Sequence, residues 1–207
     1  MPSPPGARHP SSTVLCIGHL EEVPNALPRF VCDGVWAWKP TPEKPLDSQV
    51  VVEAMVKILD RYRIHFLVGD QFSAIALRAE FRRGEIDDRE LIATSQSKIE
   101  FFGKLRESLH SNRVSLPADP TLLLELRELQ ERLSPSGNVQ ISAPQRATAH
   151  DDHACAVAWL FACTQKYKVT HCTATYSDPL AAEYSDGSEE RLAAFVDERM
   201  QFHSFGR

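Results

Sequence analysis

The sequence predicts an α/β domain in which helices pack on a mixed sheet, and three features of the chain lead to this fold class. Two strand-like segments come first, Thr13 to Leu20 and Arg29 to Trp38, and the Pro- and Asn-containing link between them is typical of an antiparallel hairpin. A short apolar run, Ile64 to Val68, then has the character of a strand that is buried on both faces. Helical and strand-like segments follow as far as Lys166, an order that favours a mixed sheet with helices packed on it.

Capping residues and apolar spacing define the elements in the first half of the chain. Asp47 or Ser48 can cap a helix that runs to about Tyr62, because either side chain can accept a hydrogen bond from a first-turn amide. The apolar stripe of this helix is Val51, Met55, Leu59 and Tyr62. The next expected elements are a helix from about Phe72 to Arg83 that stops at Gly84, a strand at Leu91 to Thr94, a helix from Ser95 or Ser97 to about Ser111, and a brief strand at Val114 to Leu116.

The second half begins with a well-marked helix start. Asp119 precedes Pro120, and a helix favours aspartate as its cap and proline in its first turn. The apolar stripe of this helix is Leu122, Leu126, Leu129 and Leu133. A strand at Val139 to Ile141 and a helix from Asp152 to about Lys166 complete the predicted domain.

The chain divides into three parts. Residues 1–12 are rich in proline and serine and are expected to form a loop or to be disordered. Residues 13–166 form the predicted domain. Residues 167–207 are less patterned, although Glu189 to Met200 is helix-like, and we interpret them as a C-terminal extension.

Composition limits the class of protein. A chain of 207 residues can form one sizeable domain, and its net charge of −5 gives no overall basic signature for nucleic acid, although a local basic rim can coexist with an acidic site. No apolar run has the length of a membrane span, and the N-terminal segment lacks the apolar core of a signal peptide, so we expect no membrane partner. The five cysteines are odd in number and lack a framework pattern, which indicates reduced thiols in a cytoplasmic protein.

Carboxylates in two places are candidate metal ligands. Asp70 directly follows the apolar run, and Asp151 and Asp152 stand at the start of a helix rich in alanine. Carboxylates at a strand end and at a helix start can bind one hard cation together. Mg²⁺ is such a cation: it takes oxygen ligands and catalyses reactions of phosphates. The alternative is that each group only caps a helix, although one aspartate suffices for a cap and the second then needs another role.

Other motifs are weaker or absent. His150, His153 and Cys155 invite a zinc interpretation, but their spacing matches no standard structural zinc site and the chain has no CxxC pair. The histidines can instead assist proton transfer or contact phosphate, or simply lie on the surface. There is no phosphate-binding GxxxxGK[ST] loop and no GxSxG nucleophile motif.

Several basic side chains are candidate contacts for the phosphates of DNA. Any one of them, however, is more commonly just a charged side chain on a solvated surface. The candidates for DNA binding are Arg82, Arg83, Lys98, Arg146 and, beside the carboxylates, His150.

Taken together, these segments resemble the nuclease domain of the large terminase subunit of tailed phages and prophages. The resemblance covers Thr13 to Phe161, and its specificity lies in the order and spacing of the segments rather than in one motif. The segments that carry it are Thr13 to His19, Asp33 to Trp38, Val68 to Asp70, Ser95 to Lys98, Asn112 to Pro117, Leu122 to Leu133 and His150 to Ala154.

The resemblance implies a ribonuclease-H-like mixed sheet and an endonuclease that cuts concatemeric double-stranded DNA during packaging. The family holds two divalent ions, here Mg²⁺ or Mn²⁺, with acidic residues. Asp70 matches the acidic residue at the end of the later strand, and either Asp151 or Asp152 matches the one at the His-Asp-Asp helix. The implied partners are an upstream ATPase domain, the small terminase subunit and the portal, in the cytoplasm of a bacterium that carries the phage or prophage.

The chain departs from the family at its first strand, which ends in an aspartate in the family. Met1 to Gly6 stands at that place here, and the ATPase domain is absent. We therefore expect a fragment with a truncated first strand, exposed strand edges and impaired activity. Two alternatives remain open: a catalytically inactive prophage remnant or DNA-binding scaffold, and another ribonuclease-H-like nuclease of the resolvase or transposase type.

Overall fold

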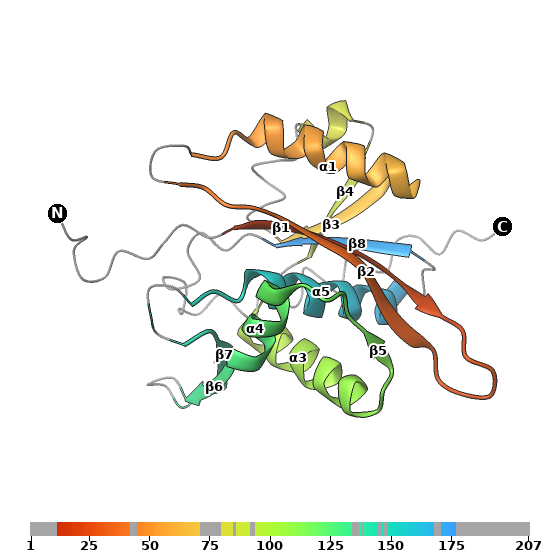
Figure 1. Ribbon diagram of the computed structural model, residues 1–207, viewed down its shortest axis with the longest axis vertical. Helices are drawn as coiled ribbons and strands as arrows, with labels where there is room; N and C mark the ends of the chain where they lie inside the picture. Colours follow the sequence, from red (N-terminus) through yellow and green to blue (C-terminus); the bar gives the residue numbers. More distant parts are fainter. Residues whose placement is uncertain are drawn as a thin grey trace.

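A six-stranded mixed sheet forms the centre of the protein (Figure 1). The computed structural model describes residues 12–41, 45–70, 80–84, 86–91, 94–133, 137, 139–144, 146, 149–167 and 171–176, of which 70, 88–91, 166–167 and 171–176 are described by their backbone alone. Within these residues, no helix combines the length and the apolar character that crossing a membrane requires.

The sheet has the strand order β4-β3-β8-β1-β2-β5, and a separate antiparallel pair, β6 and β7, lies beside it. The mixed sheet confirms the predicted fold class. The strands are β1 Thr13–Glu21, β2 Arg29–Trp38, β3 Phe66–Asp70, β4 Asp87–Leu91, β5 Val114–Ser115, β6 Gln130–Leu133, β7 Val139–Ser142 and β8 His171–Tyr176.

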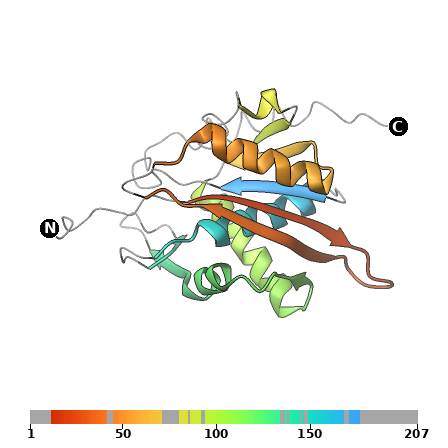
Figure 2. The same cartoon turned by 45° about the horizontal axis from the view of Figure 1, so that its top comes forward.

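β1 and β2 form the predicted antiparallel hairpin, with a bulge near its middle. The register shifts between Ile17 and Gly18, so that Ile17 pairs with Gly34 and Gly18 pairs with Cys32. Gly18 is required at this point because a Cβ atom there would lie only 2.6 Å from the carbonyl oxygen of Val31. A bulge of this kind bends a strand pair and increases its twist. In both views the long hairpin runs across the rest of the sheet (Figures 1 and 2).

β8 occupies the centre of the sheet, between β3 and β1, although it comes last among the described strands. It is antiparallel to β1, with Cys16 opposite Ala174, and parallel to β3, with Val68 opposite Ala174. Both edges of β8 are therefore paired. The exposed strand edges that we expected from a truncated first strand are therefore not found beside β1 and β3 in the described part of the chain, because β8 pairs with both. The sheet also extends beyond residue 166, where the sequence placed the end of the domain.

Helices cover the two faces of the sheet unequally (Figures 1 and 2). On one face, α1 (Ser48–Tyr62) and the helical residues 80–83 pack through an apolar cluster that includes Leu15, Met55 and Phe81. On the other face, α5 (Asp152–Tyr167) lies against the sheet, and α3 (Ser95–His110) and α4 (Pro120–Glu128) pack on α5. Alternate residues of β1 and β3 enter the two clusters, as the period of a strand requires.

α5 is the most deeply buried helix of the described chain, because it has protein on both sides. Residues 152–161 are all buried, and the small side chains of Ala154, Ala156 and Ala158 let the helix approach the sheet closely. Phe161 meets Phe30 of β2 edge-to-face at 5.4 Å between ring centroids. On the opposite side, Trp159 meets Phe101 of α3 at 4.7 Å. These aromatic pairs hold α5 between the sheet and the outer helices.

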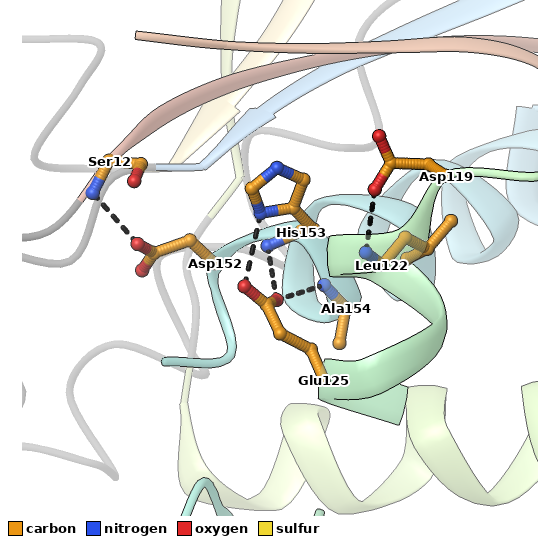
Figure 3. Close-up of polar contacts among 7 residues, drawn as sticks. All are labelled: Ser12, Asp119, Leu122, Glu125, Asp152, His153 and Ala154. Atoms are coloured by element: carbon orange, nitrogen blue, oxygen red, sulfur yellow. Dashed lines mark hydrogen bonds and ion pairs between the residues drawn. The ribbon is translucent and has the colours of Figure 1, made fainter. Parts of the chain in front are cut away.

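Several element boundaries differ from the predicted ones. The predicted helix stripe extending to Leu133 is wrong, because α4 ends at Glu128 and Leu133 lies in β6 with 75% of its surface exposed. The strand after Gly84 begins at Asp87, ahead of the predicted Leu91. The caps at Asp47 and Asp119 are confirmed: each carboxylate accepts a first-turn backbone N–H, at 2.9 Å and 2.7 Å (Figure 3 shows Asp119). Most of the expected Phe72-to-Arg83 helix lies outside the described residues, as does the helix-like Glu189-to-Met200 segment.

The central position of β8 can be tested in the full chain with proline. Thr173 lies in the middle of β8, opposite Ile17. We expect Thr173→Pro to lower the Tm by on the order of 10 °C, because proline removes a backbone donor and is excluded from central strands. The nearly isosteric Thr173→Val keeps the donor and should leave the Tm almost unchanged. Equal transitions for the two variants, followed by circular dichroism, would show that β8 is not a sheet strand in solution.

Candidate functional site

The candidate site lies at one edge of the sheet, where β3, β4 and β8 end and β1 begins. Asp70 is the last residue of β3, and its backbone pairs with Leu91, the last residue of β4. β8 runs parallel to β3, with Gly69 beside Thr175, so it ends at the same edge. β1 is antiparallel to β8, and its first residues complete this part of the molecule, which we call the Asp70 edge.

α5 begins at the Asp70 edge. Ser12, the residue before β1, donates its backbone N–H to Oδ2 of Asp152 at 2.7 Å, and both residues are buried (Figure 3). Strand alternation puts position 70 on the same face of the sheet as Val68, which belongs to the apolar cluster of α5. Asp152 and position 70 are therefore at one edge and on one face. The backbones of β3 and β1, with β8 between them, are about 10 Å apart there.

The neighbouring carboxylate, Asp151, turns to a different partner. Lys98 Nζ, from the first turn of α3, donates to Asp151 Oδ2 at 2.7 Å, and the two side chains are only 19% and 14% exposed. α3 follows β4 and starts at the cap Thr94, where Thr94 and Ser97 form a capping box. Lys98 is therefore carried to the Asp70 edge by the end of β4. It meets Asp151 there, although the two residues are 53 positions apart in the sequence.

The charges of this group are fixed by its surroundings. Burial by itself would lower the pKa of Lys98, but the Asp151 carboxylate, which accepts its hydrogen bond, opposes this effect and holds the pKa above its ordinary value, so Lys98 stays an ammonium. Burial raises the pKa of the Cys155 thiol, and the charge of Asp151 raises it further, so Cys155 stays neutral. A neutral thiol leaves Asp151 as the charged partner of Lys98.

Glu125 of α4 caps α5 from another helix. Its Oε2 accepts the backbone N–H groups of His153 at 2.7 Å and Ala154 at 3.0 Å, and its Oε1 lies 3.1 Å from Nδ1 of the His153 ring (Figure 3). Glu125 is 6% exposed, and water cannot replace it as the acceptor for buried first-turn amides. A carboxylate at this position also interacts favourably with the positive end of the helix dipole.

The zinc interpretation gains no support. The His153 ring faces Glu125, and Cys155 is completely buried. Among the described residues, no group of three or more His, Cys, Asp or Glu side chains is arranged to hold a metal ion. The side chain of Asp70 is outside that statement, because only its backbone is described.

The candidate DNA contacts do not all lie near the carboxylates. Arg82 and Arg83 are exposed in the helical turn that leads into the start of β4, at the edge of the sheet opposite Asp70. Arg146 is exposed and forms an ion pair with Glu128 at the end of α4. His150, half-buried, directly precedes Asp151. Of these four, only His150 immediately adjoins the carboxylates of α5.

Sequence reasoning missed Glu125 and Ser12 as parts of the site. For Glu125, the sequence held one signal: this charged residue lies about one helical turn after the apolar Leu122, on the side of α4 that faces the core. The structure shows that both residues are buried, so Glu125 does point inward. Ser12 contributes a backbone N–H, which any non-proline residue can supply, so its residue type carries no signal.

The fold has close counterparts among solved structures. The large terminase nuclease of thermophilic phage G20c with bound cobalt matches 72% of this chain and 81% of its own, with 21% identity and a TM-score of 0.55. The same nuclease with bound magnesium gives 20% identity and a TM-score of 0.54 over the same shares. The large terminase nuclease domain of Thermus phage P74-26 matches 74% of this chain and 80% of its own, with 23% identity and a TM-score of 0.52. The chain has the fold of a large terminase nuclease domain.

The likeness to the large terminase nuclease lies in the arrangement of elements rather than in sequence. No protein-family model matches the chain, and no curated protein does either. The terminase nuclease fold confirms the expected ribonuclease-H-like architecture.

The cap on α5 can be tested by changing its acceptor. We expect Glu125→Gln to lower the free energy of unfolding by about 2 kcal/mol, because it weakens two hydrogen bonds and removes a buried charge from a helix start. This corresponds to a fall in Tm of roughly 4–8 °C for a chain of this size. Glu131→Gln, at an exposed residue, is the matched control and should change little. A Glu125→Gln protein as stable as the control would mean that the cap is unimportant.

Proposed function

We propose that this chain is a metal-dependent endonuclease of the terminase type, acting on double-stranded DNA. The observation that carries the proposal is that the backbone position of Asp70 and the acidic start of α5 lie at one edge of the sheet, in a chain with the fold of large terminase nucleases. A strand end and a buried helix start hold acidic groups at one edge and on one face. Such placement suits an enzyme that must fix a cation against a phosphate.

The proposed ligands are Asp70 and Asp152, with Asp151 as the adjoining acidic residue. Carboxylate oxygens are the donors that Mg²⁺ and Mn²⁺ prefer, so the residues present fit such a cation. Asp152 is the better candidate of the pair, because its carboxylate lies against the start of β1, whereas Asp151 is turned toward α3. The solved terminase nucleases with bound cobalt and magnesium support a divalent ion. A second divalent ion belongs to the proposal only because the chain resembles the terminase nucleases.

A bound divalent cation would polarise the scissile phosphate and lower the pKa of an attacking water. The chain's own residues hold the site in place for this chemistry. Glu125 and the backbone of Ser12 fix the start of α5, so Asp152 cannot turn away from the edge when DNA approaches. His150, beside the carboxylates, is the proposed contact for a phosphate or a transferred proton.

The DNA path is proposed to cross the Asp70 edge rather than the opposite one. Arg146 lies before His150 in the segment that leads into α5, and we propose it as a backbone-phosphate contact. Arg82 and Arg83 lie at the far edge and are left out of this path. The packaging partners, an ATPase domain, a small terminase subunit and a portal, belong to the same proposal through the fold likeness alone.

A DNA-binding scaffold that does not cut is the second candidate. The observation that favours it is that both carboxylates of α5 already have protein donors, Lys98 for Asp151 and Ser12 for Asp152. A scaffold would bind DNA equally well with or without a divalent ion. Metal-dependent cleavage therefore separates the two candidates.

A plasmid-nicking assay tests the proposed activity. With Mg²⁺ or Mn²⁺ we expect nicking that chelator abolishes, and Asp70→Asn and Asp152→Asn should each reduce the rate by at least about a hundredfold, because each removes a metal ligand. Asp60→Asn, on the exposed face of α1, is the matched control and should cut like the parent. Cleavage that persists in chelator, or that survives both substitutions, would end the metal mechanism.

The end of β8 suggests a further acidic candidate. β8 ends beside Asp70, and the sequence carries Asp178 two residues later, outside the described residues. We expect Asp178→Asn to reduce nicking by about the same factor as Asp70→Asn if this strand supplies the acidic residue that the resemblance assigns to the first strand. Asp186→Asn is the control. Unchanged nicking in Asp178→Asn would show that β8 completes the sheet without contributing to the chemistry.

A further inference from the structure

Lys98 is the basic residue most closely joined to the carboxylates, and its geometry differs from that of a DNA contact. Its side chain is only 19% exposed, and its ammonium lies 2.7 Å from a carboxylate oxygen of Asp151. A phosphate-binding lysine on an open face would instead keep its head in water.

The two adjacent carboxylates of α5 therefore have separate surroundings. Asp151 is turned to α3 and is neutralised by Lys98, whereas Asp152 is turned to the start of β1. Without a cation, adjacent aspartates next to a third acidic position would repel one another at a helix start that is largely shielded from water. Lys98 reduces that repulsion and selects which way Asp151 points.

We propose that Lys98 is a positioning residue, an internal counter-ion that holds Asp151 toward α3 and leaves Asp152 to face the Asp70 edge. It acts through Asp151 and does not itself contact DNA. This inference extends the proposed function as a metal-dependent nuclease. Its predicted effect on metal binding rests on that proposed function. The ion pair itself belongs to the metal-free protein and can be tested there.

The first experiment needs neither metal nor DNA. Thermal unfolding is measured for Lys98→Met, Asp151→Asn and the double variant, because methionine keeps the buried stem of the lysine without its charge. We expect each single variant to lower the Tm by roughly 5 °C, and the double variant to lose clearly less than the sum of the two losses. Lys104→Met, on the exposed part of α3, is the matched control and should unfold like the parent. Additive losses would overturn the inference, whatever the protein's activity.

The second experiment separates a counter-ion from a phosphate contact. Titration with Mn²⁺, followed by calorimetry, should give about tenfold tighter binding in Lys98→Met, because the variant removes a positive charge that opposes the cation. Unchanged or weaker Mn²⁺ binding would overturn the inference. If the parent protein binds no Mn²⁺ at all, the proposed function fails, and the unfolding cycle still decides whether Lys98 and Asp151 are coupled.

The third measurement is the salt dependence of binding to a DNA duplex in chelator. Removing a lysine that contacts a phosphate lowers the slope of log K against log salt by about 0.9. We expect no change of slope in Lys98→Met. A fall of that size would show that Lys98 leaves Asp151 for the DNA backbone and would overturn the assignment. Lys98→Arg should keep the Tm of the parent, because a guanidinium can still pair with Asp151.

Discussion

The buried amino end of α5 is the constraint on which the rest of the structure depends. A helix start leaves several backbone N–H groups without partners, and here water cannot supply them, because residues 152–155 are all buried. The protein supplies Glu125 from α4 as the acceptor. The position of α4 relative to α5, and with it the packing of the outer helices, follows from this requirement.

The same constraint gathers acidic side chains at the start of α5, where their negative charges repel one another. Glu125, Asp151 and Asp152 all lie within one turn of the start of α5, and the helix dipole offsets only part of their mutual repulsion. Each has a donor that fixes its direction: the amides of α5, the ammonium of Lys98 and the backbone of Ser12. Carboxylates held in this way do not need to reorganise when a cation arrives, which is the property that preorganised sites share.

Much of the fold could be predicted from local patterns, and the missing parts have a common physical cause. The hairpin, the caps at Asp47 and Asp119 and the alanine-rich α5 are recorded in residue type and spacing over a few positions. β8 was missed although its residues His171–Tyr176 alternate polar and apolar side chains, because six residues are a short signal and the place of the strand between β3 and β1 is set by partners distant in the sequence. Leu133 was assigned to a helix because its spacing fits, yet the strand partner in β7 overrides that spacing.

Only part of the candidate site could be predicted: the sequence singled out Asp70, Asp151 and Asp152, whereas Glu125, Ser12 and the directions of the aspartates were missed. Position 70 at a strand end and Asp152 at a helix start lie at one edge of the sheet, and their joint role in holding a metal stays a prediction. Which of two adjacent aspartates faces the sheet depends on a lysine 53 residues away, and no local pattern encodes that contact. A lysine beside an acidic site is usually assigned to the substrate. In this chain its burial against Asp151 makes it part of the protein's own charge balance, so the proposed phosphate contacts are residues further from the centre of the site.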